Sequence, residues 1–196
     1  MLLLSEHAIA GRGLTGMYFE TDFASFLAWR DWGFPDSSVR NVFPQAALLS
    51  VDGAFLLGKM AAHTANPGHV YFPSGTPDLN DVDGDRVDVG AGLLRELEEE
   101  TGITAADVAV EPGWTAVFDG PRIALIRIVR SAEPAIALRE RILGNLAASA
   151  DPELADVLVV RSPADHDPHM TAYVTAYLDH FWRRQPPDTG VSVAPR

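Results

Sequence analysis

The segment from Asp88 to Gly102 constrains the fold more than any other part of the sequence. Asp88 is a favourable helix N-cap, and Gly102 is the residue type that ends a helix in the left-handed conformation. A helix is therefore predicted over residues 89–101. Gly92, inside it, is interpreted as a point of close packing on a sheet. The predicted buried stripe of this helix consists of Leu93, Leu94 and Leu97.

The remaining elements alternate between strand and helix patterns. Two Asp-Gly dipeptides, Asp52-Gly53 and Asp119-Gly120, lie between apolar runs and predict two hairpins. The expected strands are 45–51, 54–60, 70–72, two strands within 116–129, and 157–160. The expected helices are 89–101, 135–148 and 170–184, and the last has an aromatic face that we assign to the core. Residues 1–40 form a mixed lead-in, with a short strand within 8–20 and a helical turn within 23–32. This alternation predicts a mixed sheet between helical layers, an α/β fold.

The overall composition limits the function classes. The 196 residues suit one compact domain, which we place at 1–184, followed by a loose tail at 185–196. The chain has no cysteine, which excludes disulfides, thiolate catalysis and zinc-thiolate sites. The net charge of -12 argues against a broad nucleic-acid surface. No apolar run predicts a membrane span or a signal peptide, so the expected location is cytoplasmic.

Three glutamates share one face of the predicted helix. Glu96, Glu99 and Glu100 stand at positions i, i+3 and i+4, so their carboxylates lie close together. Each like-charge pair costs roughly 0.2–0.5 kcal/mol on an exposed helix. Divalent cations with oxygen ligands offset that repulsion, and magnesium commonly shares its ligands between carboxylates and phosphates. A solvated acidic helix face is the alternative interpretation, and for a glutamate cluster alone it is the more common one.

The surrounding residues favour a metal site. The string Arg95-Glu96-Leu97-Glu98-Glu99-Glu100-Thr101-Gly102-Ile103 resembles the second half of the Nudix box, and every defined position of that pattern is filled. Upstream, Phe72-Pro73-Ser74-Gly75 resembles the strand end and glycine that open the box. The resemblance covers about residues 42–130. It implies a Nudix-like α/β/α sandwich and a pyrophosphohydrolase that cleaves a diphosphate linkage in a nucleoside diphosphate derivative or related organic pyrophosphate. The alternative is a non-catalytic metabolite sensor on the same fold.

The resemblance also implies roles for individual residues. Glu96, Glu99 and Glu100 would bind Mg²⁺ or Mn²⁺, the carbonyl of Gly75 would complete the metal shell, and Arg95 would orient a carboxylate. The general base would be one of the glutamates or an acidic residue from outside the box, for which the candidates are Asp119, Glu140 and Glu153. The expected partner is a small nucleotide-like diphosphate, and a homodimer is compatible with the family.

One part of the pattern departs from the box. The box has a glutamate eight positions before the arginine, and counting back from Arg95 places Val87 there. The segment from Gly75 to Ile103 is six residues longer than the box, which indicates an insertion in the loop. We expect Asp85 or Asp88 to replace the glutamate that ties the loop to the helix. The acidic stretch 81–85 lacks the glycine and glutamate of a calcium loop, and we interpret it as solvated.

The histidines give weaker signals. His63 and His69 flank a turn between strands, and contact with the substrate is the less favoured interpretation for them. His166 and His169 are separated by a proline, which makes a helical metal-binding pair unfavourable, and we assign them to a surface loop.

Overall fold

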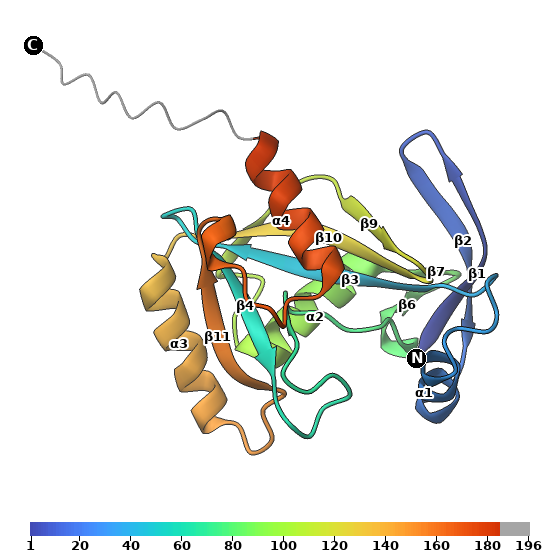
Figure 1. Cartoon of the computed structure of the whole chain (residues 1–196), viewed down its shortest axis with the longest axis horizontal. Coiled ribbons are helices and arrows are strands. Elements are labelled where there is room, and N and C mark those ends of the chain that lie inside the picture. Colours follow the sequence, from blue (N-terminus) through green and yellow to red (C-terminus); the bar gives the residue numbers. More distant parts are fainter. Residues whose placement is uncertain (185–196) are drawn as a thin grey trace, which may run out of the picture.

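The computed structural model describes residues 1–184 and centres on one mixed β-sheet (Figure 1). The hydrogen-bonded order is β11-β4-β3-β10-β8, with β5 paired to β4 and β9 paired to β10. Strands β3 and β10 run parallel, and the other pairs are antiparallel. The strand bounds are β3 Asn41–Leu49, β4 Phe55–Met60, β5 Val70–Tyr71, β8 Val108–Val110, β9 Thr115–Asp119, β10 Arg122–Ser131 and β11 Leu154–Val160.

Helices cover both faces of this sheet. On one face, α2 (Val89–Thr101) and α3 (Ala135–Ala148) bury apolar side chains together with Leu48, Leu56 and Val129 of the strands. On the other face, α4 (Ala172–Arg184) packs Tyr173 and Tyr177 against Phe43 and Phe55. The predicted α/β/α sandwich and the assignment of the aromatic face of the last helix to the core are both confirmed.

Short-range sequence signals explain the hairpins. Strands β3 and β4 meet at Asp52-Gly53, where Gly53 has a φ of 80°. Strands β9 and β10 meet at Asp119-Gly120, where Gly120 has a φ of 58°. A left-handed backbone of this kind favours glycine, which is why these dipeptides predict the turns. Both predicted hairpins are confirmed.

Helix α2 begins and ends where the sequence indicates. The side chain of Asp88 accepts hydrogen bonds from the backbone N–H groups of Gly90 and Ala91. Gly102 lies in the left-handed region with φ 70°, and its N–H donates to the carbonyl of Glu98. Leu93 and Leu97 are fully buried, and the carboxylate-bearing face of the helix is directed away from that core.

The N-terminal region is more regular than expected. It forms a long hairpin of β1 (Leu2–Ala10) and β2 (Gly13–Glu20), followed by α1 (Phe23–Asp31). The strand predicted within 8–20 corresponds to β2, whereas its partner β1 was not predicted. The apolar start of β1 is buried because it packs beside β3, which the sequence pattern alone did not indicate.

Short elements complete the described chain. They are the 3₁₀ turns η1 (Leu79–Asp81) and η2 (Pro163–Asp165), and a small hairpin of β6 (Val82–Asp83) and β7 (Arg86–Val87). Within residues 1–184, none of the helices has the length and apolar character that crossing a bilayer requires. The tail predicted at 185–196 lies outside the described residues.

Candidate active site

The loop after β5 lies directly against the acidic face of α2. A Cβ atom placed on Gly75 would overlap the carboxylate of Glu96, so any other residue at this point would displace that carboxylate. The side chain of Glu96 is 15% exposed. Its pKa is raised to about 7, chiefly by burial; Arg95 lowers the pKa and the neighbouring Glu99 raises it. The structure thus holds a carboxylate in a poorly solvated position beside the Gly75 backbone.

Glu100 is more deeply buried than Glu96. Its side chain accepts a hydrogen bond of 3.4 Å from the backbone N–H of Ser74 through Oε1. Its other oxygen, Oε2, is buried and has no hydrogen-bond partner among the described residues. Burial raises the pKa of Glu100 well above its ordinary value, and the nearby charge of Glu96 adds to the effect. A buried acceptor without a donor is costly unless a ligand or ion satisfies it.

Arg95 connects the glutamates to the loop that precedes α2. Its Nη1 lies 2.9 Å from Oε1 of Glu96 and 3.0 Å from Oε2 of the exposed Glu99. Its Nη2 lies 3.1 Å from Oδ2 of Asp81. Asp81 is only 4% exposed, although the sequence suggested a solvated acidic stretch there. Arg95 therefore fixes the loop and two of the three glutamates relative to one another.

The anchoring acid was assigned wrongly from the sequence. Asp85 is exposed and lies near Arg86, and Asp88 caps α2, so neither contacts Arg95. Asp81 does so, and Gly92 makes room for it, because a Cβ on Gly92 would lie 2.9 Å from Oδ1 of Asp81. Gly92 thus permits close approach of a carboxylate rather than of a sheet. Counting forward from Gly75, instead of back from Arg95, finds Asp81 after five intervening residues.

A cavity of about 230 Å³ opens beside the acidic face of α2. We call it the acidic cavity. Its acidic lining residues are Glu96, Glu98, Glu99, Glu100, Asp151 and Glu153. The glutamates are therefore directed into a hollow of the molecule, which the interpretation as a solvated helix face did not predict.

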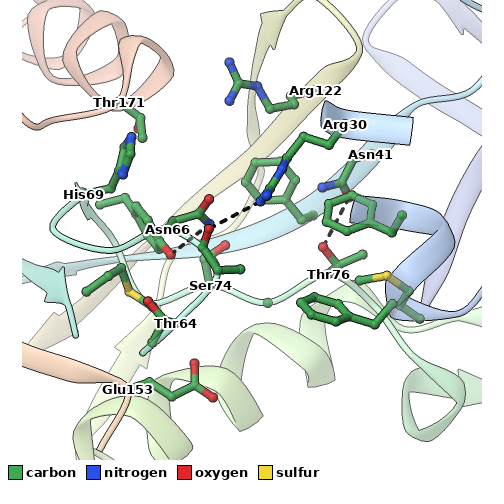
Figure 2. A pocket seen from close by; sticks show the side chains of 18 of the residues that line it. Arg30, Asn41, Thr64, Asn66, His69, Ser74, Thr76, Arg122, Glu153 and Thr171 are labelled. Carbon is green, nitrogen blue, oxygen red and sulfur yellow. Dashed lines mark hydrogen bonds between the residues drawn. The ribbon is translucent and has the colours of Figure 1, made fainter. Parts of the chain in front are cut away.

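A second cavity, of about 290 Å³, lies on the other side of the Gly75 loop (Figure 2). We call it the aromatic cavity because Phe23, Phe26, Phe43, Tyr71 and Tyr173 line it. Ser74, Gly75 and Thr76 also line it, and Glu153 lines both this cavity and the acidic cavity. The loop that touches Glu96 and Glu100 thus forms a wall of the second hollow.

The other acidic candidates lie in different places. Glu153 adjoins the glutamates, and its charge contributes to the raised pKa values of both Glu96 and Glu100. Asp119 ends β9 and pairs with Arg122 at 2.6 Å. Glu140 is exposed on α3 and is not part of the lining of the acidic or the aromatic cavity.

The histidines divide in a similar way. His69 lines the aromatic cavity, and His63 faces Asp151 at 3.2 Å. His169 pairs with Asp167 at 2.9 Å, and the ring of His166 lies 5.6 Å from that of Trp182.

The residues present fit a hard divalent cation. The donor set consists of carboxylate oxygens, and the Oε2 of Glu100 is buried without a partner among the described residues. In the described conformation Glu99 is bonded to Arg95, and no group of three or more acidic or histidine side chains in residues 1–184 already converges on one point. Glu99 would have to turn from Arg95 to join Glu96 and Glu100.

Comparison with known proteins supports the fold. No family model and no curated protein sequence matches this chain. Among solved structures, a bifunctional NMN adenylyltransferase/ADP ribose pyrophosphatase from Francisella tularensis has a TM-score of 0.52 at 14% identity, over 82% of this chain and 46% of that chain. A C. elegans Ap4A hydrolase has a TM-score of 0.50 at 15% identity, over 72% and 96%. Tm1382, a candidate Nudix hydrolase, has a TM-score of 0.50 at 13% identity, over 84% and 87%. By its architecture, this chain has the Nudix hydrolase fold.

Proposed function

We propose that the chain hydrolyses a diphosphate linkage in a small nucleotide-like molecule, with Mg²⁺ or Mn²⁺ held by Glu96, Glu99, Glu100 and the carbonyl of Gly75. The observation that carries the proposal is the buried Oε2 of Glu100, which has no partner in residues 1–184 and lies beside a second buried carboxylate. Two adjacent carboxylates that are shielded from water destabilise the folded protein when both are ionised, unless a cation offsets their charge. A cation satisfies both.

Asp81 supports the proposal from outside the helix. It follows Gly75 after five residues, as the first glutamate of the Nudix box does, and it makes the contact with Arg95 that ties loop to helix. The six extra residues are then 82–87, which form the β6–β7 hairpin. On this assignment the loop is lengthened after its anchor, and the positions of Gly75 and the glutamates relative to each other are retained.

The chain's own groups have distinct tasks in this reaction. The bound metal would neutralise phosphate charge and lower the pKa of a bound water. Arg95 holds Glu96 in place, and the Gly75 loop brings its backbone up to the metal-binding face. Glu153 borders both cavities, so its carboxylate is our candidate to accept the proton of the attacking water.

The experiment that tests this function is a substrate panel assayed with and without Mg²⁺. The panel contains dinucleotides, nucleoside triphosphates, ADP-ribose and coenzyme A. We expect metal-dependent release of a phosphorylated product from at least one of them, and a strong loss of turnover in Glu99→Gln and Glu100→Gln with the fold intact. Glu140→Gln is the matched control, because Glu140 is an exposed glutamate on α3.

Two outcomes contradict the proposal. If Glu99→Gln and Glu100→Gln hydrolyse the same substrate at the wild-type rate, the assigned site is wrong. If no compound is hydrolysed and one binds tightly, the chain is a metabolite sensor instead.

A further inference from the structure

The aromatic cavity has two ends of different character. At one end is Glu153 (Figure 2), which also lines the acidic cavity together with the proposed metal-binding glutamates. Away from that end are two arginines from separate elements, Arg30 of α1 and Arg122 of β10 (Figure 2), which we call the arginine wall. Figure 2 shows Glu153 well separated from both arginines, with the cavity between them. A ligand that spans the cavity therefore meets carboxylates at one end and guanidinium groups at the other.

The arginine wall brings positive charge into a cavity of a protein whose net charge is negative. Of the 15 Lys and Arg residues in the chain, Arg30 and Arg122 line this cavity. Arg30 bonds Asp31 at 3.0 Å through Nε, and Arg122 bonds Asp119 at 2.6 Å through Nη2. Each arginine is thus partly neutralised by a carboxylate close to it in sequence. These pairs orient the guanidinium groups without using all of their donors.

Several donors of the arginine wall remain unused by the described residues. The Nε of Arg122 is buried and has no hydrogen-bond partner among residues 1–184. Arg30 makes one further contact, a long bond of 3.4 Å from Nη1 to the carbonyl of Ala65. Guanidinium groups present forked donors that match phosphate oxygens. The free donors of these two arginines therefore suit an anionic group of a ligand.

The space between the two ends suits a nucleoside. Phe43 and Tyr173 form an edge-to-face pair with ring centroids 5.6 Å apart, and the guanidinium carbon of Arg122 lies 5.8 Å from the centre of the Tyr173 ring. Asn41, which accepts a hydrogen bond from Thr76, also lines this part. Aromatic rings with a few polar groups are typical of pockets for flat heterocyclic ligands.

We infer that the substrate carries a phosphate monoester remote from the scissile diphosphate, and that the arginine wall binds this second phosphate. The inference rests on the proposed function, which places the scissile linkage beside the metal-binding glutamates and Glu153. The diphosphate and the arginines are then at opposite ends of the cavity, so the arginines contribute to substrate choice and not to the cleavage itself. The substrate class is a nucleoside diphosphate derivative with an additional phosphate on its nucleoside.

The test uses pairs of compounds that differ by one phosphate monoester. These are dephospho-coenzyme A and coenzyme A, ADP-ribose and its 2′-phosphate, and NADH and NADPH. With Mg²⁺ we expect the phosphorylated member of at least one pair to have a kcat/KM about tenfold or more higher, as loss of a charge-assisted contact predicts. In Arg30→Gln and Arg122→Gln the ratio of the two kcat/KM values within a pair should fall to about twofold.

Two controls keep the result interpretable. Arg12→Gln alters an exposed arginine at the β1–β2 turn and should retain the preference. Thermal melting of each variant shows whether the fold is intact, and since the two arginines lie on different elements, one variant suffices if the other unfolds. Absence of any preference in the wild type, or a preference that survives both substitutions, overturns the inference.

Binding measurements separate this inference from the proposed function. Calorimetric titration of the metal-free protein with the same pairs requires no turnover. If no compound is hydrolysed but the phosphorylated members bind about tenfold tighter, and Arg30→Gln and Arg122→Gln abolish the difference, the arginine wall is correct and the hydrolase assignment is wrong. If a compound is hydrolysed but neither assay discriminates within a pair, the hydrolase assignment is correct and the arginine wall is wrong.

Discussion

Replacing Glu96 by glutamine should stabilise the metal-free protein at neutral and alkaline pH. Burial raises the pKa of Glu96 to about 7 from the ordinary 4.5, so the folded state holds its proton more tightly than the unfolded state does. Ionising the group in the folded state therefore costs roughly 3 kcal/mol at pH 8. The 15% exposure of the side chain reduces this to about 1–3 kcal/mol, and glutamine avoids it altogether.

The difference in free energy of unfolding between the variant and the wild type grows with pH. Below pH 4.5 Glu96 is protonated in both states, so the variant and the wild type should have equal free energies of unfolding. Between pH 4.5 and 7 the folded wild type binds more protons than the unfolded chain, so its stability falls relative to the variant as pH rises. Above pH 7 the difference reaches its full value. Titrating groups remote from Glu96 are common to both proteins and cancel in the comparison. Glu100, whose pKa the charge of Glu96 raises, is destabilised less in the variant and adds to the difference.

The assay is urea denaturation in EDTA, followed by tryptophan fluorescence, at several values from pH 4.5 to 8. Glu140→Gln is the control, and its stability should track that of the wild type because Glu140 is exposed. Saturating Mg²⁺ should reduce or reverse the difference in free energy of unfolding between the variant and the wild type, because a cation stabilises the carboxylate form of the wild type. A variant less stable than wild type at pH 8 in EDTA, or a gap that is constant with pH, would show that Glu96 is not destabilised by burial.

Three further substitutions test the geometry. Gly75→Ala should lower turnover by roughly 10–100-fold, because its Cβ would displace the carboxylate of Glu96, whereas Gly144→Ala, with open space around it, should have wild-type kinetics. Asp81→Asn should lower the urea-derived free energy of unfolding by about 1–3 kcal/mol, since it removes the buried partner of Arg95; a cost no larger than that of Asp85→Asn would contradict the anchoring role. Glu100→Gln should melt no lower than wild type in EDTA yet gain less melting temperature from Mg²⁺, and an undiminished gain would mean that the metal binds elsewhere.

Local signals account for what the sequence predicted well. The boundaries of α2 follow from Asp88 and Gly102, because caps act within one helical turn and need no tertiary context. The hairpins at Asp52-Gly53 and Asp119-Gly120 are local for the same reason. The grouping of Glu96, Glu99 and Glu100 on one helix face also follows from helical periodicity alone.

The features that sequence reasoning missed depend on contacts between distant residues. Asp81 was missed as the anchoring acid because its position depends on where the six extra residues are inserted. Counting back from Arg95 places them before the anchoring acid, whereas the contact between Asp81 and Arg95 places them after it. Arg30 and Arg122 are far apart in the chain, and they line the same cavity because α1 and β10 both border it. The N-terminal hairpin was missed because the start of β1 is a run of apolar residues without the alternation of a half-buried strand. Its burial depends on contacts with β3, which is distant in the sequence.

The β6–β7 hairpin has a consequence for how this protein can be modified. A backbone hydrogen bond of 2.7 Å from the N–H of Asp88 to the carbonyl of Asp81 joins the two ends of the excursion, so the chain leaves and returns at almost the same point. Residues within it can be shortened, exchanged or extended at little entropic cost while Asp81 and Asp88 stay in place. A reporter peptide or affinity tag could therefore be inserted in this hairpin, close to α2, without redesigning that helix.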